Sequence, residues 1–159
     1  MDSEIIRETL SKCELFSGLS DEELSLIVEL ASLEECKGGD AIYEQGKLGT
    51  RLYVLSKGQV SLLRRSRFND DTIATSTVYI LRETPLRRIM GCWCTLVGEQ
   101  HIQMCSAKCD RPSKIVSMAC SDLRKVFKKN AEIRTKILEK FVLILRDRLE
   151  SSYGALETL

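Results

Sequence analysis

The chain has 159 residues and a mass of 18.0 kDa, the size of one domain with a substantial core. Its 24 Lys and Arg residues nearly balance its 23 Asp and Glu residues, so net charge draws it neither to nucleic acid nor to an anionic membrane. The N-terminus lacks the order of a secretion signal, and no apolar run reaches the roughly 20 residues that span a bilayer. We therefore expect a cytoplasmic protein, away from membranes, whose seven cysteines are mostly free thiols.

The N-terminal third indicates two helices. Residues 2–12 carry three apolar side chains at helical spacing, Ile5, Ile6 and Leu10. Further along, Ser20 and Glu23 have the spacing of a capping box, in which each side chain accepts a hydrogen bond from the other residue's backbone amide. We expect a helix of about three turns to follow, with one apolar face made of Leu24, Ile27, Val28 and Ala31.

The middle of the chain indicates short strands between glycine turns. The segments with apolar alternation or β-branched composition are 41–46, 51–65 with a break at Lys57-Gly58, 72–81 and 114–118. A short helix over Leu123, Val126 and Phe127 is expected next, capped by Ser121-Asp122. The expected order is helices, then about seven or eight strands, then helices. This order predicts an α+β fold, a β-roll of the jelly-roll barrel type with N-terminal helices and a long C-terminal helix.

One long helix is predicted from residue 131 to about 152. Its apolar residues recur every three or four positions, namely Ile133, Ile137, Leu138, Phe141, Ile144, Leu145 and Leu149. This stripe is wider than a small domain covers by itself and continues past the last strand. It either packs wholly on the roll or also meets a second copy, and we favour a homodimer through 131–152. We thus expect a roll over 1–130 and a dimerisation helix over 131–159.

Three glycine-containing motifs occur in order, LFSGLSDEEL at 15–24, KGGDAIYEQG at 37–46 and LYVLSKGQV at 52–60. With the long C-terminal helix, they resemble the cyclic-nucleotide-binding domain of the catabolite activator protein family over essentially the whole chain. Turn glycines at 39, 46 and 58 would supply the positive φ that tight corners of a roll need. The resemblance implies a regulatory domain that senses a small ligand and signals through its C-terminal helix.

In that family the segment between the sixth and seventh strands is a phosphate-binding cassette, and it corresponds here to residues 91–109, which we call the cassette segment. A helix N-terminus and an Arg hold the cyclic phosphate, and a Glu holds the ribose. Here Gln103 stands at the position of the Arg, and Met104 stands at the position of the Thr or Ser that follows it. The residues around Trp93 resemble the bacterial branch of the family in which a Trp replaces the Glu. The resemblance places the ligand-binding residues at Trp93, Cys94, Thr95, Gln103, Met104, Ser106, Ser152 and Tyr153. Trp93 could equally be a packing residue of the core.

The missing Arg affects which ligand we expect. A charged hydrogen bond is worth about 1.5–3 kcal/mol, so its loss weakens binding roughly ten- to a hundredfold. The cofactor therefore remains unknown, because a cyclic nucleotide is the family's ligand but tight binding of cyclic AMP or cyclic GMP is not expected.

Residues 91–109 hold four of the seven cysteines and the only histidine. A zinc or iron–sulfur site could use Cys92, Cys94, Cys105 and Cys109. The C-x-C spacing differs from that of zinc ribbons, and buried free cysteines commonly serve as small apolar residues. We expect no metal here and place His101 in a loop, while a cysteine-based metal or redox sensor stays as the alternative function.

A degenerate dimerising scaffold without a ligand is the other alternative. An enzyme is not expected, because the single histidine has no carboxylate pair or nucleophile spaced around it. In the family a DNA-binding helix-turn-helix follows the long helix, and Leu159 leaves no room for one. We therefore expect no direct contact with nucleic acid and an output that passes through another protein.

Overall fold

The computed structural model describes residues 1–67 and 69–157, and the side chains of residues 95 and 155–157 lie outside this description. The helical elements are α1 (Asp2–Lys12), η1 (Glu14–Phe16), α2 (Asp21–Val28), η2 (Trp93–Val97), α3 (Cys120–Lys129) and α4 (Ala131–Glu157). The strands are β1 (Ala31–Cys36), β2 (Ala41–Tyr43), β3 (Leu48–Gly49), β4 (Arg51–Lys57), β5 (Val60–Arg67), β6 (Ile73–Leu81), β7 (Ile89–Gly91), β8 (His101–Ile102), β9 (Ser106–Cys109) and β10 (Ser113–Ala119). The expected order of helices, strands and helices is confirmed.

The strands form a roll of antiparallel sheets. One sheet has the order β1-β10-β4-β7, a second has the order β2-β9-β5-β6, and β3 pairs with β8. The turn between β4 and β5 depends on Gly58, whose φ is +110°. A Cβ added there would lie within 3 Å of the Ser113 side chain, so both the backbone angle and the crowding require glycine. The expected positive φ at Gly39 and Gly46 is also confirmed.

Two clusters of buried side chains make up the core. The first lies between the helices and the sheet β1-β10-β4-β7, with Leu10, Phe16, Ile27, Val54 and Met118 among its members. The second fills the interior of the roll, with Leu55, Val60, Leu81, Met90 and Ile115 among its members. The first cluster also contains three residues of α4, which ties that helix to the body of the domain.

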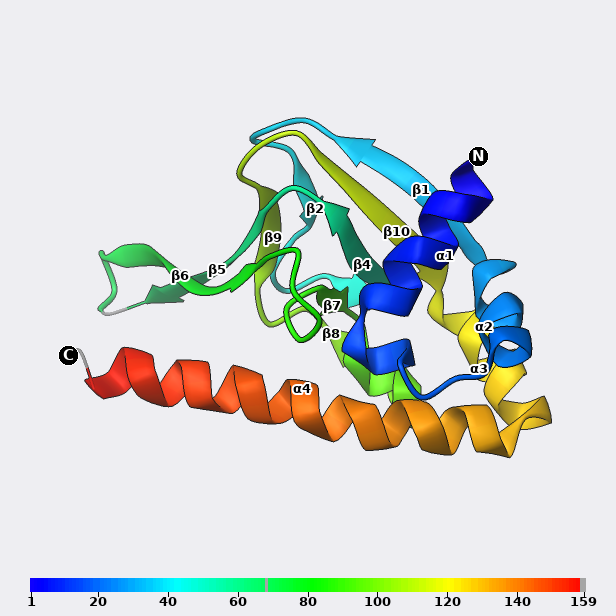
Figure 1. The fold of residues 1–159 in the computed structure, drawn as a ribbon. Coiled ribbons are helices and arrows are strands. Elements are labelled where there is room, and N and C mark those ends of the chain that lie inside the picture. Colours follow the sequence, from blue (N-terminus) through cyan, green and yellow to red (C-terminus); the bar gives the residue numbers. More distant parts are fainter. Residues whose placement is uncertain (68, 158–159) are drawn as a thin grey trace.

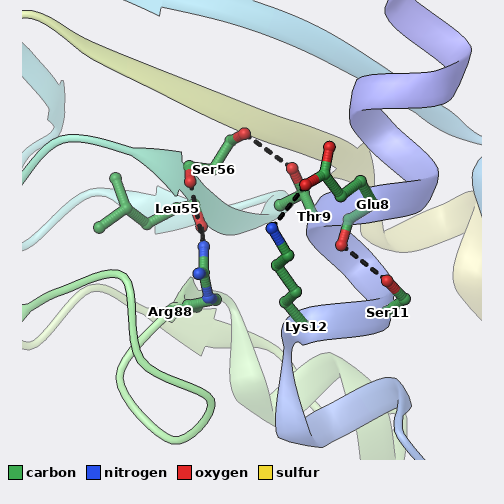
Figure 2. A network of polar contacts seen from close by, with 7 residues as sticks. All are labelled: Glu8, Thr9, Ser11, Lys12, Leu55, Ser56 and Arg88. Carbon is green, nitrogen blue, oxygen red and sulfur yellow. Dashed lines mark hydrogen bonds and ion pairs between the residues drawn. The ribbon is translucent and has the colours of Figure 1, made fainter.

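Polar contacts hold α1 against the roll, as Figure 2 shows. The Thr9 hydroxyl donates to the Ser56 hydroxyl of β4 over 2.7 Å, and Thr9 is only 4% exposed. From the other side, Arg88 donates to the backbone carbonyl oxygens of Leu55 and Ser56 at 2.9 and 3.0 Å. Strand β4 is therefore held between the first helix and the segment that leads into β7.

The C-terminal helix divides its apolar residues between two faces. Ile133, Ile137 and Ile144 are buried in the core. Next to this buried face a stripe of exposed apolar side chains follows the helix, namely Val142, Leu145, Leu149 and Tyr153. We call these four residues the outer stripe. Figure 1 shows α4 passing along one side of the roll, from α3 to the β5–β6 hairpin.

Three local predictions need correction. Helix α2 ends at Val28, and Ala31 begins β1, because residues 31–36 pair with β10 in a register that only the tertiary structure supplies. Helix α3 begins at Cys120 and has no side-chain cap, so the cap expected from Ser121-Asp122 is wrong. The described residues form ten strands where we expected seven or eight. By contrast, the capping box of Ser20 and Glu23 is confirmed by both of its hydrogen bonds.

No helix among the described residues has the length and apolar character needed to cross a membrane.

Candidate functional site

A pocket of about 310 Å³ lies between the roll and α4. The roll and the cassette segment supply Tyr43, Leu62, Val78, Tyr79, Gly91, Trp93, His101, Gln103, Met104 and Cys105 to its wall, and α4 supplies Leu145, Arg148, Leu149 and Ser152. This volume is at the lower end of the range for small-molecule sites. A ligand held there would touch the roll and the long helix at once.

Among the residues that line this pocket, Arg148 of α4 carries a full charge, and it is only 9% exposed. Its guanidinium carbon lies 3.9 Å from the centroid of the Tyr79 ring and 4.7 Å from that of Trp93. One nitrogen, Nη2, donates to the carbonyl oxygen of Ile89, while Nε has no hydrogen-bond partner. Burial lowers the pKa of Arg148, and Tyr79 partly opposes that effect. Because an arginine still keeps its proton in proteins, the pocket holds a fixed positive charge.

Tyr79 of β6 connects this arginine to a polar pair, Asp147 of α4 and Arg87 of the β6–β7 connection. Its hydroxyl donates to Asp147 over 2.5 Å, and the same carboxylate lies 3.6 Å from Nε of Arg87. Burial and the Asp147 hydrogen bond raise the pKa of Tyr79 to about 12. Tyr79 therefore remains neutral near pH 7, and Asp147 is committed to Tyr79 and Arg87.

Trp93 packs against α4 and also lines the pocket. Its ring packs edge-to-face on Phe141 of α4, with centroids 5.9 Å apart. The same indole lines the pocket, and its Nε1 is buried without a hydrogen-bond partner. Trp93 is thus a packing residue and a wall of the pocket.

Four other predicted ligand-binding residues divide between the pocket and its surroundings. Gln103, Met104 and Ser152 line the pocket, and Gln103 is 5% exposed. Ser106 is not among the lining residues. Its hydroxyl accepts a hydrogen bond from the backbone amide of Gln45 over 2.9 Å.

The remaining predicted ligand-binding residues are not placed in the pocket. Tyr153 is 56% exposed and belongs to the outer stripe. Cys94 lies beside the pocket and contacts His101, its Sγ 3.2 Å from Nδ1. The side chain of Thr95 lies outside the described residues.

The four candidate metal ligands lie in different surroundings. Cys92 forms a disulfide with Cys120, Cys94 contacts His101, Cys105 lines the pocket, and Cys109 lies against Cys36. Burial raises the pKa of both thiols, Cys105 and Cys109, to about 12 for Cys109. Among the described residues, no three His, Cys, Asp or Glu side chains gather as metal ligands.

The expected loop position of His101 is wrong. The residue lies in β8, is 5% exposed and pairs with Gly49 of β3. Burial lowers its pKa, and the hydrogen bond to Gln103 partly opposes this shift. The neutral imidazole is therefore the form that the folded protein favours near pH 7.

Sequence reasoning missed Arg148 as a pocket residue. Counted from Ile137 and Ile144 at helical spacing, position 148 continues the buried face of α4. A charged residue at a core-facing position was the signal that could have identified it, because such residues are seldom buried without a specific role or partner.

The fold has many counterparts among solved structures, and those described below share 16–20% of their residues with this chain. A cyclic nucleotide-binding domain from Methylobacillus flagellatus KT matches with a TM-score of 0.77 and 17% identity, covering 98% of this chain and 83% of that one. The N-terminal domain of a transcriptional regulator from Streptomyces coelicolor A3(2) has a TM-score of 0.69 and 20% identity, covering 90% and 94%. The chain has the fold of a cyclic-nucleotide-binding domain. The expected fold class is therefore confirmed.

A ligand-bound structure also shares this fold. The regulatory domain of Toxoplasma gondii PKA, crystallised with cAMP, has a TM-score of 0.67 and 16% identity, covering 89% of this chain and 49% of that one. No protein-family model matches the sequence, and a search of the curated proteins finds no match.

Proposed function

We propose that this chain is a ligand-sensing regulatory module, in which a small molecule binds between the roll and α4 and the helix carries the signal to a partner. The observation that carries the proposal is the composition of the pocket wall. Residues of β6, β7 and the cassette segment form one side, and residues of α4 form the other. A ligand that contacts both sides changes the free energy of α4 in its docked position, which is the differential interaction that a switch requires.

The comparisons support a small regulatory ligand of the nucleotide type. A domain of this fold binds cAMP in the PKA structure, and transmission through the long helix is what the resemblance implies. The family's cassette arginine is absent here, since no Arg occurs between Arg88 and Arg111. We therefore expect cyclic AMP and cyclic GMP to bind weakly compared with such domains.

The same proposal includes a homodimer formed through α4. Its support is the outer stripe, in which Val142, Leu145, Leu149 and Tyr153 are 63%, 41%, 52% and 56% exposed. Exposed apolar residues at helical spacing are typical of helix pairing. Because Leu145 and Leu149 also line the pocket, ligand binding and pairing would share residues.

A binding screen tests the main proposal. Thermal unfolding of the full chain is followed with cyclic AMP, cyclic GMP, linear nucleotides and nucleosides. A ligand at 100 times its dissociation constant stabilises the folded state by about 2.7 kcal/mol, which is readily measured. At least one of these compounds should raise the melting temperature. No response across the whole screen would favour the scaffold without a ligand.

A redox sensor is the second candidate, and a specific observation favours it. The Cys92–Cys120 disulfide joins the residue before η2 to the first residue of α3, the helix that leads into α4. When the Cys92 and Cys120 thiols form this disulfide, they pass two electrons and two protons to an oxidant such as glutathione disulfide, which becomes two glutathione thiols. The redox state of one pair could therefore alter the cassette segment and the position of α4 together.

A further inference from the structure

The guanidinium of Arg148 is buried without a carboxylate partner. It is 9% exposed and makes one hydrogen bond, from Nη2 to the Ile89 carbonyl oxygen. None of the ion pairs among the described residues includes Arg148. A buried charge without a partner is costly, and proteins normally supply a counter-charge or several hydrogen bonds to compensate. The two aromatic faces compensate only in part, because a cation–π contact is worth roughly 0.5–2 kcal/mol.

The neighbouring carboxylate does not fill this role. Asp147 is the next residue along α4, but it accepts the Tyr79 hydroxyl and lies 3.6 Å from Arg87. The Asp147 carboxylate is thus engaged by another arginine, whose guanidinium carbon lies 5.1 Å from the centroid of the Tyr79 ring. The described part of the chain offers Arg148 the Ile89 carbonyl oxygen, two aromatic rings and the nearby Tyr79 hydroxyl, but no carboxylate that pairs with it.

A second unpaired donor lies in the same pocket wall. Nε1 of Trp93 is buried and has no acceptor, and the indole lies 4.7 Å from the guanidinium carbon of Arg148. Both residues line the pocket, and an oxyanion is the ligand group that a buried guanidinium without a carboxylate partner favours. The open volume beside them is about 310 Å³, which accommodates a small organic molecule.

We propose that the pocket binds the anionic group of a small organic oxyanion, a phosphate ester or a carboxylate, and that Arg148 of α4 is its charge partner. This inference rests on the proposed function and specifies its ligand class. The apolar part of the ligand would contact Leu62, Val78 and Leu149, which line the same space. The cation thus comes from the long helix, whereas the resemblance places it in the cassette segment.

This origin of the charge has a mechanical consequence. An anion held by the roll alone would affect α4 only through intermediate residues. An anion held by Arg148 interacts with the helix directly, and this attraction is lost if α4 leaves the roll. The ligand therefore binds the docked arrangement more tightly, and the same difference in affinity stabilises that arrangement.

The test compares charged and neutral probes on the full chain. Melting temperatures and dissociation constants are measured at constant ionic strength with inorganic phosphate, cyclic AMP and adenosine. The variants are R148Q, which removes the charge, and R148K, which keeps the charge without the planar fork. R146Q is the matched control, because Arg146 lies on the same helix with a side chain that is 64% exposed and pairs with Glu150.

Phosphate and cyclic AMP should stabilise the wild type and R146Q alike. In R148Q the affinity for cyclic AMP should fall at least tenfold while that for adenosine stays within twofold, and R148K should recover part of the loss. If R148Q does not fold, the preference for cyclic AMP over adenosine is compared between the wild type and R148K, where it should shrink.

Two results would overturn the inference. One is a wild type that neither phosphate nor cyclic AMP stabilises. The other is an R148Q protein that keeps its preference for cyclic AMP over adenosine, or loses affinity for both equally. Adenosine or cyclic AMP that binds independently of Arg148 leaves the proposed function standing while the anion site fails. The two proposals can therefore fail separately.

Discussion

The guanidinium of Arg148 lies over the indole of Trp93, with its central carbon 4.7 Å from the ring centroid. This contact joins the start of η2 to the C-terminal half of α4, two segments far apart in the chain. Trp93 also meets Phe141, about two helical turns before Arg148, so a single indole contacts α4 at two levels. The cassette segment and the long helix are therefore in direct contact through Trp93.

The first prediction concerns that contact. Trp93→Phe keeps an aromatic ring against Phe141 but weakens the cation–π contact, because phenyl rings attract cations less than indole does. The free energy of unfolding should fall by about 0.5–2 kcal/mol. Urea denaturation followed by circular dichroism measures the change. Tyr153→Phe is the control, since this exposed residue should leave stability unchanged, and an equal loss in both variants would contradict the assignment.

The second prediction concerns pH and the single histidine. Burial lowers the pKa of His101 from its ordinary value of 6.5, so the unfolded chain binds a proton more readily than the folded protein. Stability is therefore full above the unfolded pKa and declines as the pH falls through about 6.5 towards the lower folded value. Denaturant titrations between pH 7.5 and 5.5 should show this decline.

Because the chain has one histidine, the assignment can be checked directly. The variant His101→Gln should be less stable at pH 7.5 but should lose little further stability down to pH 5.5. A decline as steep as that of the wild type would mean that other groups cause it.

The third prediction tests pairing through the outer stripe. Leu145 is 41% exposed, and Leu145→Asp replaces this apolar side chain with a charged one. The substitution should convert a dimer into a monomer, which light scattering detects. Leu26→Asp on α2 is the matched control, because Leu26 is 39% exposed and lies on a different surface. A dimer that persists in Leu145→Asp, or that is lost equally in both variants, would argue against α4 as the interface.

The fourth prediction tests the disulfide. The Cys92–Cys120 link closes a loop with a sequence separation of 28 residues, for which chain entropy gives roughly 3–4 kcal/mol of stabilisation. A strong reductant should lower the melting temperature of the wild type, and Cys120→Ser should remove this dependence. Cys94→Ser is the control and should keep it, because Cys94 is a free thiol. Thiol alkylation followed by mass spectrometry should find five free thiols without reductant and seven with it.

The sequence by itself determined the order of elements, the turn glycines and the capping box of Ser20 and Glu23. These features depend on backbone angles and on contacts within a few residues, which local sequence specifies. The short strands were harder, as Ala31 shows, because a strand forms only when a partner such as β10 is present. The pocket segment around Trp93 and Gln103 was found through its resemblance to a cassette.

Only the tertiary structure decided which groups meet in the pocket. The missing cassette arginine could be read from the sequence, but the arginine that lines the site stands on another element and arrives through the packing of Ile137 and Ile144. Likewise, Cys92 pairs with Cys120 and Cys109 lies against Cys36, although the sequence places Cys92, Cys94, Cys105 and Cys109 within one short stretch. The physical reason is the same in each case. Neighbours along a chain share local geometry, whereas neighbours across a core are set by how buried faces pack together.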